Sequence, residues 1–306
     1  MKAKQVVGIV AILVVVVGVV LLVSTTKNSV SNSNGKIQVV AAENFWGSLV
    51  SQIGGKDVTV RSIVSDPNAD PHEYESNAAD ARDIATANYV ILNGVGYDDW
   101  ASKLISASPN GSRKVLTVAN LVDVKDGENP HLWYNPNYVN IAIVQMEKDL
   151  ATIQPSDTSY FKAQLQALQS SLAQYQDRIS NIKKQFGGTK VAATEDIFAY
   201  LANATGLDLV SPPEFTEAVA EGNDPPASSV ATFQQQLQSG QVKVLVYNEQ
   251  TVTPLTTSIK QLAAQQNIPT VGVTETIQPP DTPFQVWMNS ELIDLENALN
   301  AQALGQ

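Results

Sequence analysis

Cysteine is absent from the 306 residues of the chain. Its absence excludes disulfide bonds, thiolate metal sites, thiol catalysis and a lipid attached to a cysteine. A metal bound by this chain must use histidine nitrogen and carboxylate oxygen. This restriction excludes thiolate-rich zinc and copper sites. Manganese, zinc, iron and similar ions remain as candidates.

Positive charge is scarce: 19 lysines and arginines stand against 30 acidic residues, for a formal net charge of -11. This balance excludes nucleic acid as the expected partner, because a phosphate backbone is bound by clustered lysine and arginine. Apolar residues make up 43% of the chain and charged residues 16%, as in globular proteins. The length predicts two lobes of about 100–150 residues each.

Charge is missing altogether from residues 6–23, which follow Lys2 and Lys4. The run is long enough for a membrane-spanning helix and longer than the usual apolar core of a secretory signal. We therefore predict an uncleaved transmembrane anchor (signal-anchor) at 6–23 after a cytoplasmic n-region at 1–5, with a cleaved signal as the alternative. The preceding lysines place the body on the extracytoplasmic side of the cell membrane; cleavage would make it secreted or periplasmic. The Ser- and Asn-rich residues 24–36 predict a flexible tether.

From residue 37 onward, β-rich runs alternate with helical stretches in two series of similar rhythm, without a detectable sequence repeat. Alternation of this kind predicts α/β lobes with parallel sheets, here four strands each. We place the lobes at 37–153 and 188–306. The predicted strands are Ile37–Ala41, Val58–Val64, Tyr89–Leu92, Lys114–Val118, Lys190–Ala193, Leu207–Val210, Val242–Tyr247 and Thr270–Val273.

A long helix at 154–187 is predicted between the lobes. Pro155 and Ser156 provide its start, and Gly187 and Gly188 provide its end. Apolar residues at alternating spacings of three and four form a single stripe along it. The stripe fits a dimerising coiled coil or a backbone helix packed across both lobes; we favour the backbone helix, because two short lobes need an element that fixes their geometry.

Histidine is also scarce, since His72 and His131 are the only two. Each follows a proline, precedes aromatic residues and lies in a loop after a predicted strand, so its backbone is expected to be stiff. A lone loop histidine is usually only solvated. Two Pro-His pairs, each followed by aromatic residues, favour metal ligation, because aromatic rings can shield and orient an imidazole.

Glu195 and Glu275 each follow a predicted strand of the second series. Ligands of open parallel sheets collect beyond the carboxyl ends of strands, so these glutamates are expected to face the two histidines across one cleft. Two imidazoles and two carboxylates neutralise a divalent ion and suit manganese, iron or zinc. The alternative for either glutamate is a helix-capping acid that the helix dipole favours.

Four motifs occur in an order that resembles one family, the metal-binding subunits of manganese and zinc ABC importers (TroA-like, cluster A-I solute-binding proteins). The resemblance extends from Ile37 to about Leu299. The motifs are Asp70–Glu75 with Ala85–Gly94 and Trp100, Pro130–Trp133, Thr194–Leu201 and Thr274–Ile277.

The resemblance implies a solute-binding protein, not an enzyme, with two lobes joined by one backbone helix. Its ligands would be His72, His131, Glu195 and Glu275, holding one Mn²⁺ or Zn²⁺ ion, with Fe²⁺ as a further candidate. It also implies delivery to an ABC importer permease, and we expect a monomer. Affinity is expected to fall as the pH drops through the ordinary histidine range near about 6.5, because the ligands must be deprotonated.

The sequence departs from the family pattern at several places. Asn129 stands where the second motif usually has aspartate, and Glu195 replaces a histidine common in zinc-type members, which resembles the manganese subgroup. Glu275 stands where aspartate is frequent. Residues 215–226 form an insertion of unassigned role, and the helix at 6–23 would replace the family's usual lipidated cysteine.

Two other functions remain open from the residues. A secreted metal-dependent hydrolase would need a general base such as Glu73 or Glu249 beside a metal-bound water. No nucleophile elbow, HExxH helix or phosphate-binding loop is present in the sequence to support it. A surface protein with a role in cell adhesion could use the same scaffold.

Overall fold

The computed structural model describes residues 35–68 and 71–304. The predicted anchor at 6–23 and almost all of the predicted tether lie outside these residues, as does Asp70 of the first motif. Among the described residues, no helix has both the length and the apolar character needed to cross a membrane.

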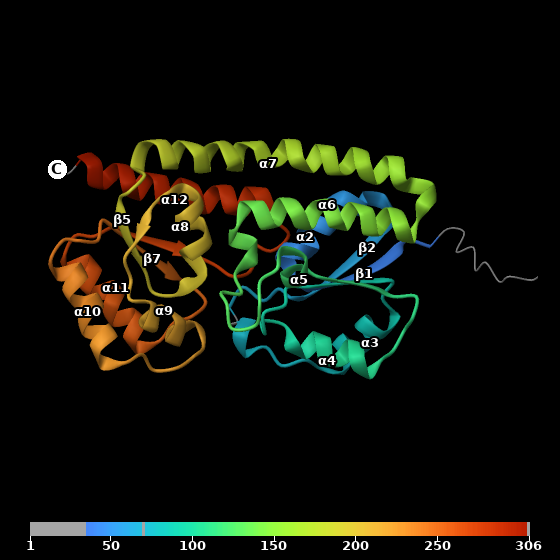
Figure 1. The fold of residues 1–306 in the computed structure, drawn as a ribbon, viewed down its shortest axis with the longest axis horizontal. Helices are drawn as coiled ribbons and strands as arrows, with labels where there is room; N and C mark the ends of the chain where they lie inside the picture. The colour runs from blue at the N-terminus through green and yellow to red at the C-terminus, as the bar shows by residue number, and fades with distance from the viewer. Residues whose placement is uncertain (1–34, 69–70, 305–306) are drawn as a thin grey trace, which may run out of the picture. The chain divides into compact units, whose positions relative to one another are not determined.

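The first half contains a four-stranded parallel sheet with the strand order β2-β1-β3-β4 (Figure 1). Two helices pack on one face around a core that includes Ile84 and Ala101, and the other face packs against longer helices. The strands are β1 (Ile37–Glu43), β2 (Val58–Val64), β3 (Tyr89–Leu92) and β4 (Lys114–Thr117), and the helices are α2 (Asn44–Gly54), α3 (Ala78–Thr86), α4 (Asp99–Ala107), α5 (Val118–Val122) and α6 (Pro136–Ile153).

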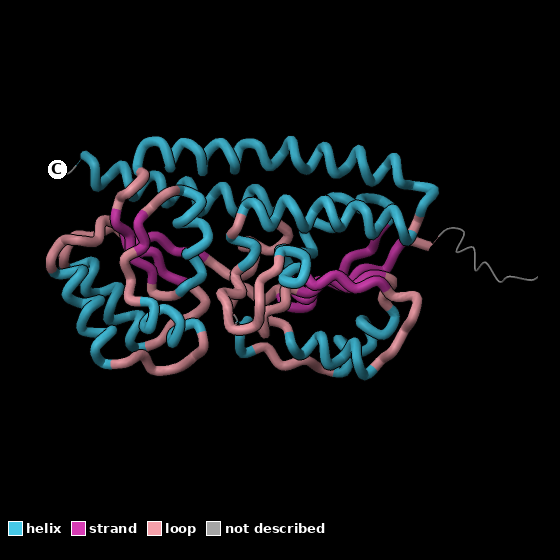
Figure 2. The backbone as a smooth tube through the Cα atoms, in the orientation of Figure 1, coloured by secondary structure: helices cyan, strands magenta, loops and turns pink. Residues whose placement is uncertain are grey.

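The second half repeats this topology in the strand order β6-β5-β7-β8, again with all strands parallel. Figure 2 shows the strands of both halves in magenta and the helices in cyan. The predicted insertion at 215–226 forms part of this half, since Phe215 is buried with its ring centroid 4.9 Å from that of Phe233. The elements are β5 (Lys190–Ala193), β6 (Asp208–Leu209), β7 (Val244–Asn248), β8 (Thr270–Val273), α8 (Ala199–Thr205), α9 (Pro213–Ala220), α10 (Ala227–Gln238) and α11 (Pro254–Gln265).

Helix α7 (Thr158–Phe186) connects the halves and contacts α2 and α6 of the first half and α8 and α12 of the second. Its apolar stripe lies within the core of this chain, so the stripe serves the backbone helix that we favoured and not a coiled-coil dimer. The predicted fold class, two parallel four-stranded lobes joined by a long helix, is confirmed. The buried residues of the stripe are Phe161, Leu165, Leu168, Leu172, Tyr175, Ile179 and Ile182.

A second long helix, α12 (Phe284–Leu304), lies beside α7 in Figure 1. The sequence analysis did not predict it, because its apolar residues are not confined to one face: Trp287 and Leu292 are buried, whereas Val286 is exposed. The helix begins against α2, where the backbone N–H of Phe284 donates to Ser48 Oγ at 3.0 Å. The chain therefore links its two halves a second time.

Hydrogen bonds also cross between the halves near the ends of the strands. Asn44 Oδ1 accepts from the N–H of Ile277 at 3.0 Å. The Tyr134 hydroxyl donates to the carbonyl of Thr274 at 2.9 Å. Both bonds are buried, so each would leave unsatisfied polar groups if the halves separated.

Candidate metal centre

All four predicted ligand residues come together in one place. One ligand atom from each of His72, His131, Glu195 and Glu275 lies within 4.8 Å of the others. Glu195 and Glu275 closely follow β5 and β8, whereas His72 lies in a short 3-10 helix (Pro71–Glu73) after β2, and His131 lies in a loop after α5, which follows β4. The positional rule for open parallel sheets thus accounts for the cluster.

Burial differs among the four residues. The side chains of His131, Glu195 and Glu275 are fully buried, whereas that of His72 is 23% exposed. Glu195 Oε1 and His131 Nε2 have no hydrogen-bond partner among the described residues. Buried polar atoms are normally hydrogen-bonded, so these two atoms fit a role as donors to a cation.

The His131 imidazole is oriented by groups on its far side. Its Nδ1 lies 2.9 Å from Asn129 Oδ1 and 3.1 Å from Asp196 Oδ1. Both are acceptors, so Nδ1 carries the proton and Nε2 presents its lone pair to the cluster. The Asn129 amide also donates to the carbonyl of Asp196 at 2.7 Å. Asparagine thus supplies the orienting bond at the position where the family usually has aspartate.

The backbone before His131 is held by Asn93, which follows β3. Asn93 Nδ2 donates to the carbonyl of Pro130 at 2.8 Å, and Asn93 Oδ1 accepts from the Trp46 indole N–H at 3.3 Å. The Trp133 ring stacks on Phe45 with centroids 3.9 Å apart. The aromatic residues of the second motif therefore anchor the ligand loop in the core of the first half.

Glu275, which comes from the second half of the chain, contacts residues of the first half. Its Oε2 accepts from the Tyr97 hydroxyl at 2.6 Å and lies 3.3 Å from His72 Nε2 and 3.9 Å from His131 Nε2. Its backbone N–H donates to Gln250 Oε1 at 2.7 Å, which fixes the loop after β8. The sequence analysis missed Tyr97, because a tyrosine in a glycine-rich loop carries no signal of its own.

The two buried carboxyl groups differ in their affinity for a proton. Burial and the neighbouring Glu275 carboxylate raise the pKa of Glu195 well above its ordinary value. Burial acts on Glu275 in the same direction, but the hydrogen bond and charge of His72 and the charge of His131 lower the pKa of Glu275 to about 2. In the metal-free site Glu195 therefore holds a proton more tightly than Glu275 does.

This difference predicts that a metal ion displaces a proton from Glu195. The Glu195→Gln variant mimics the protonated side chain and has no carboxyl proton for a metal ion to displace. Zinc binding should release about one proton fewer, and affinity should fall about tenfold or more. Calorimetry in buffers of different ionisation enthalpy measures both quantities.

Glu249→Gln is the matched control for Glu195→Gln. Glu249 lies in the same half but is exposed and outside the cluster. Its replacement should leave proton release and affinity unchanged. Equal proton release from Glu195→Gln and the wild type would contradict the assignment of the proton to Glu195.

Asn248 is a second residue that the sequence analysis missed. It ends β7 and is 2% exposed. Its amide nitrogen lies 2.6 Å from Glu195 Oε2 and 2.6 Å from Glu275 Oε1. The same rule that selected Glu195 and Glu275, a polar residue at the carboxyl end of a strand, could have selected it.

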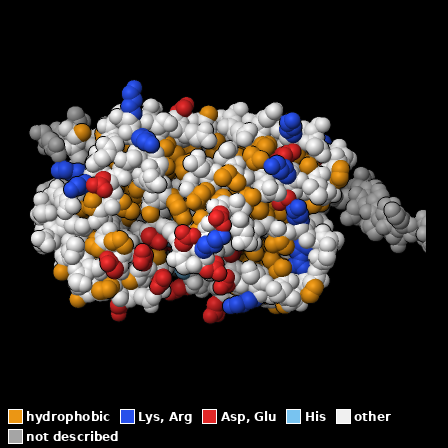
Figure 3. All heavy atoms as spheres, viewed as in Figure 1, with side chains coloured by type: hydrophobic (Ala, Val, Ile, Leu, Met, Phe, Trp, Pro, Cys, Tyr) orange, Lys and Arg blue, Asp and Glu red, His pale blue; other side chains and the backbone are white. Residues whose placement is uncertain are grey.

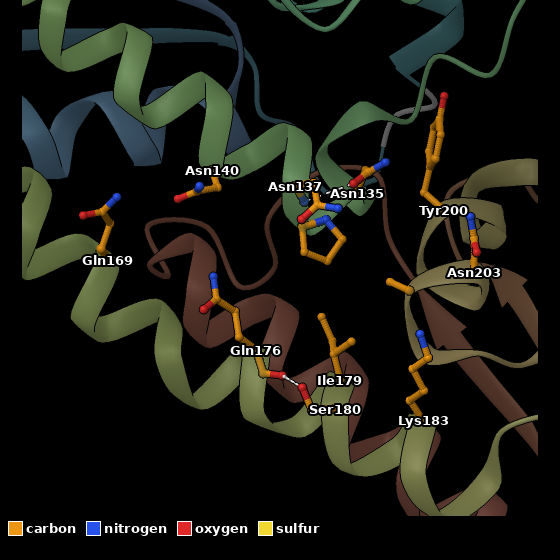
Figure 4. A pocket seen from close by; sticks show the side chains of 12 residues that line it. Asn135, Asn137, Asn140, Gln169, Gln176, Ile179, Ser180, Lys183, Tyr200 and Asn203 are labelled. Atoms are coloured by element: carbon orange, nitrogen blue, oxygen red, sulfur yellow. Dashed lines mark hydrogen bonds between the residues drawn. The ribbon is translucent and has the colours of Figure 1, made fainter.

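A cavity of about 660 Å³ lies elsewhere, between α6, α7 and α8 (Figure 4). Amide side chains line much of it, including Asn137, Gln169, Gln176 and Asn203. None of the four clustered residues lines this cavity. The metal centre is therefore a small buried cluster, and the large cavity is not part of it.

Acidic side chains gather in the lower middle of the face shown in Figure 3, whereas lysines and arginines are more scattered. The net charge of -11 has the same sign. A negative field of this kind raises the local concentration of cations and speeds their approach.

The sequence matches a protein-family model over residues 39–298, and that family is described as the periplasmic zinc-uptake complex component A, ZnuA. The chain belongs to this family. The matched residues include strands of both sheets and all four clustered residues. The family resemblance seen in the sequence is thereby confirmed.

Relatives of this ZnuA-family chain carry names that refer to metals. The manganese ABC transporter substrate-binding lipoprotein PsaA of Streptococcus mitis is 26% identical over 212 residues, which cover 63% of this chain and 68% of that protein. The manganese-binding lipoprotein MntA of Halalkalibacterium halodurans is 24% identical over 183 residues, which cover 57% of this chain and 59% of that protein.

Solved structures of similar fold support the ZnuA-family architecture. The solute-binding protein FpvC of Pseudomonas aeruginosa, in complex with Mn²⁺, matches with a TM-score of 0.72 and 19% identity over 87% of this chain and 99% of that chain. A crystal structure of ZnuA matches with a TM-score of 0.70 and 21% identity over 86% of this chain and 99% of that chain. These likenesses establish the fold of the two-lobed body.

Proposed function

We propose that this chain is the extracytoplasmic solute-binding protein of an ABC importer and captures one divalent transition metal ion, Mn²⁺ or Zn²⁺, between its two lobes. The observation that carries this proposal is the buried cluster of two histidines and two glutamates, with ligand atoms within 4.8 Å of one another. The metal is cargo, held by His72, His131, Glu195 and Glu275. Family membership and the metal-related names of the relatives support the same function.

The site binds and does not catalyse. Glu73 and Glu249, the two glutamates considered as general bases, are exposed and lie outside the cluster. Catalysis would require a base beside an open metal position. The buried ligand set instead suits a cation that is held until it is handed to a permease.

We divide the body into lobes at 37–153 and 188–306, joined by the segment 154–187. The relatives are named lipoproteins, but this chain has no cysteine to carry a lipid. The apolar segment 6–23 would then hold the monomeric body on the outer side of the cell membrane, next to the permease.

Metal content is the direct test of this function. The full chain, purified in detergent and freed of metal, should bind one Zn²⁺ or one Mn²⁺ ion per chain, measured by elemental analysis after equilibration and desalting. Binding should raise the unfolding temperature, because the ion binds only the folded state. A content of zero or of two ions per chain would contradict the four-ligand site.

A further inference from the structure

The Asn248 side chain lies between the two candidate carboxylate ligands. An amide nitrogen carries two hydrogens, and here one points to each carboxylate: Glu195 Oε2 and Glu275 Oε1 both lie 2.6 Å from Asn248 Nδ2. Hydrogen bonds to an ionised carboxylate such as that of Glu275 are shorter and stronger than neutral ones. Asn248 therefore restrains both side chains at once.

The orientation of this amide is set by the backbone. Asn248 Oδ1 accepts from the N–H of Gln250 at 2.9 Å, so the nitrogen must be the atom that faces the carboxylates. Thr251 Oγ1 lies 3.0 Å from the same nitrogen and gives a longer third contact. The amide cannot flip without losing the bond to Gln250 and placing its oxygen against two acidic groups.

These bonds decide which oxygen of each glutamate remains for a metal. With Oε2 held by Asn248, Glu195 offers Oε1, which is buried and has no hydrogen-bond partner among the described residues. With Oε1 held by Asn248, Glu275 offers Oε2, the atom that faces His72 and His131. Each carboxylate thus presents one oxygen to the cluster.

We propose that Asn248 is a positioning residue that keeps both glutamates monodentate, limits the protein to four ligand atoms, and so makes the site selective for Zn²⁺ over Mn²⁺. The proposal rests on the proposed metal-binding function of the cluster. Zinc is commonly four-coordinate and tetrahedral with nitrogen and oxygen ligands. Manganese belongs with the ions that suit octahedral, oxygen-rich sites, which two bidentate glutamates would approach.

The Asn248→Leu variant tests this role, because leucine has a similar size and lacks the amide hydrogens. Competition titrations of the full chain in detergent give the ratio of the dissociation constants for Mn²⁺ and Zn²⁺. The ratio should fall about tenfold or more in the variant, as zinc loses its oriented ligands and manganese gains the second oxygens. Thr251→Val, which removes the longer contact to the same amide, should change the ratio less than about threefold. An unchanged ratio in Asn248→Leu overturns the proposal.

X-ray absorption at the zinc edge of the wild-type protein provides a test that does not depend on a variant folding. Four nitrogen or oxygen neighbours at about 2.0–2.2 Å are expected. Five or more nearest neighbours would overturn the monodentate arrangement. If the wild type binds neither metal, the proposed function fails. If the wild type binds one metal ion and the ratio of the dissociation constants is unchanged in Asn248→Leu, only the role of Asn248 fails.

Discussion

Replacing His131 with alanine is expected to weaken zinc and manganese binding about 100- to 1,000-fold. Structural zinc sites in small peptides contribute about 10–16 kcal/mol, or roughly 2.5–4 kcal/mol for each of four ligands. His131 is fully buried, and its Nε2 faces Glu275 Oε2 at 3.9 Å. Asn129 holds the ring in this orientation, and alanine leaves no donor atom at this position.

The measurement for His131→Ala is a competitive titration with each metal on protein first stripped by a chelator. Trp133→Phe is the matched control, because it perturbs the same loop and its stacking on Phe45 without removing a ligand; its affinity should change less than about tenfold. Unfolding curves in chelator separate loss of a ligand from loss of the fold. Affinity within about threefold of the wild type in His131→Ala would contradict the ligand assignment.

The second large expected effect concerns Glu291, which should make the stability of the folded protein depend on pH. Its carboxyl group is buried where α12 meets the other half: Oε1 lies 3.0 Å from the N–H of Thr274, and Oε2 lies 2.8 Å from the Tyr134 hydroxyl. Burial raises the pKa of Glu291 from 4.5 to about 8. As a neutral acid, Glu291 can donate to the Tyr134 oxygen while that hydroxyl donates to the carbonyl of Thr274, so each hydrogen has one acceptor.

The sign of the effect follows from the raised pKa. Between pH 4.5 and about 8 the folded protein keeps a proton on Glu291 that the unfolded chain has lost, so stability falls as the pH rises through this window. Each pKa unit corresponds to about 1.4 kcal/mol, and the full loss approaches about 5 kcal/mol. Glu291→Gln mimics the neutral acid at every pH. It should therefore be more stable than the wild type at pH 8.5 by up to this amount and similar to it at pH 4.5.

Denaturant unfolding of the metal-free protein across this pH range measures the difference. Glu214→Gln makes the same chemical change at an exposed position of α9 and should give a curve parallel to that of the wild type. If Glu291→Gln also gives a parallel curve, Glu291 does not carry the proton in the folded state.

The sequence predicted the elements that depend on local pattern. The bounds predicted for Val58–Val64 and Tyr89–Leu92 agree with β2 and β3, because short apolar runs between turn residues define buried strands. The positional rule for strand ends also placed His72 and Glu195 in one site. Both successes rest on information that lies within a few residues of the chain.

Other features depend on contacts between distant segments and left no local signal. Helix α12 carries the apolar residues Val286 and Ile293 on its exposed face, so its sequence shows no one-sided apolar stripe. Asn248 is uncharged, and its importance arises only because the fold brings two carboxylates to its amide. The raised pKa of Glu291 depends on the burial of this α12 side chain against Thr274 and Tyr134, which no spacing in the sequence reveals.

The partial exposure of His72 bears on the rate at which the ion leaves. The three other ligands are buried, and hydrogen bonds such as those of Asn44 and Tyr134 hold the lobes together around them. Separation of the lobes would break these bonds together, whereas the His72 side chain is already partly exposed to solvent. In the proposed metal complex, we therefore expect the bond to His72 to be the first to break on release.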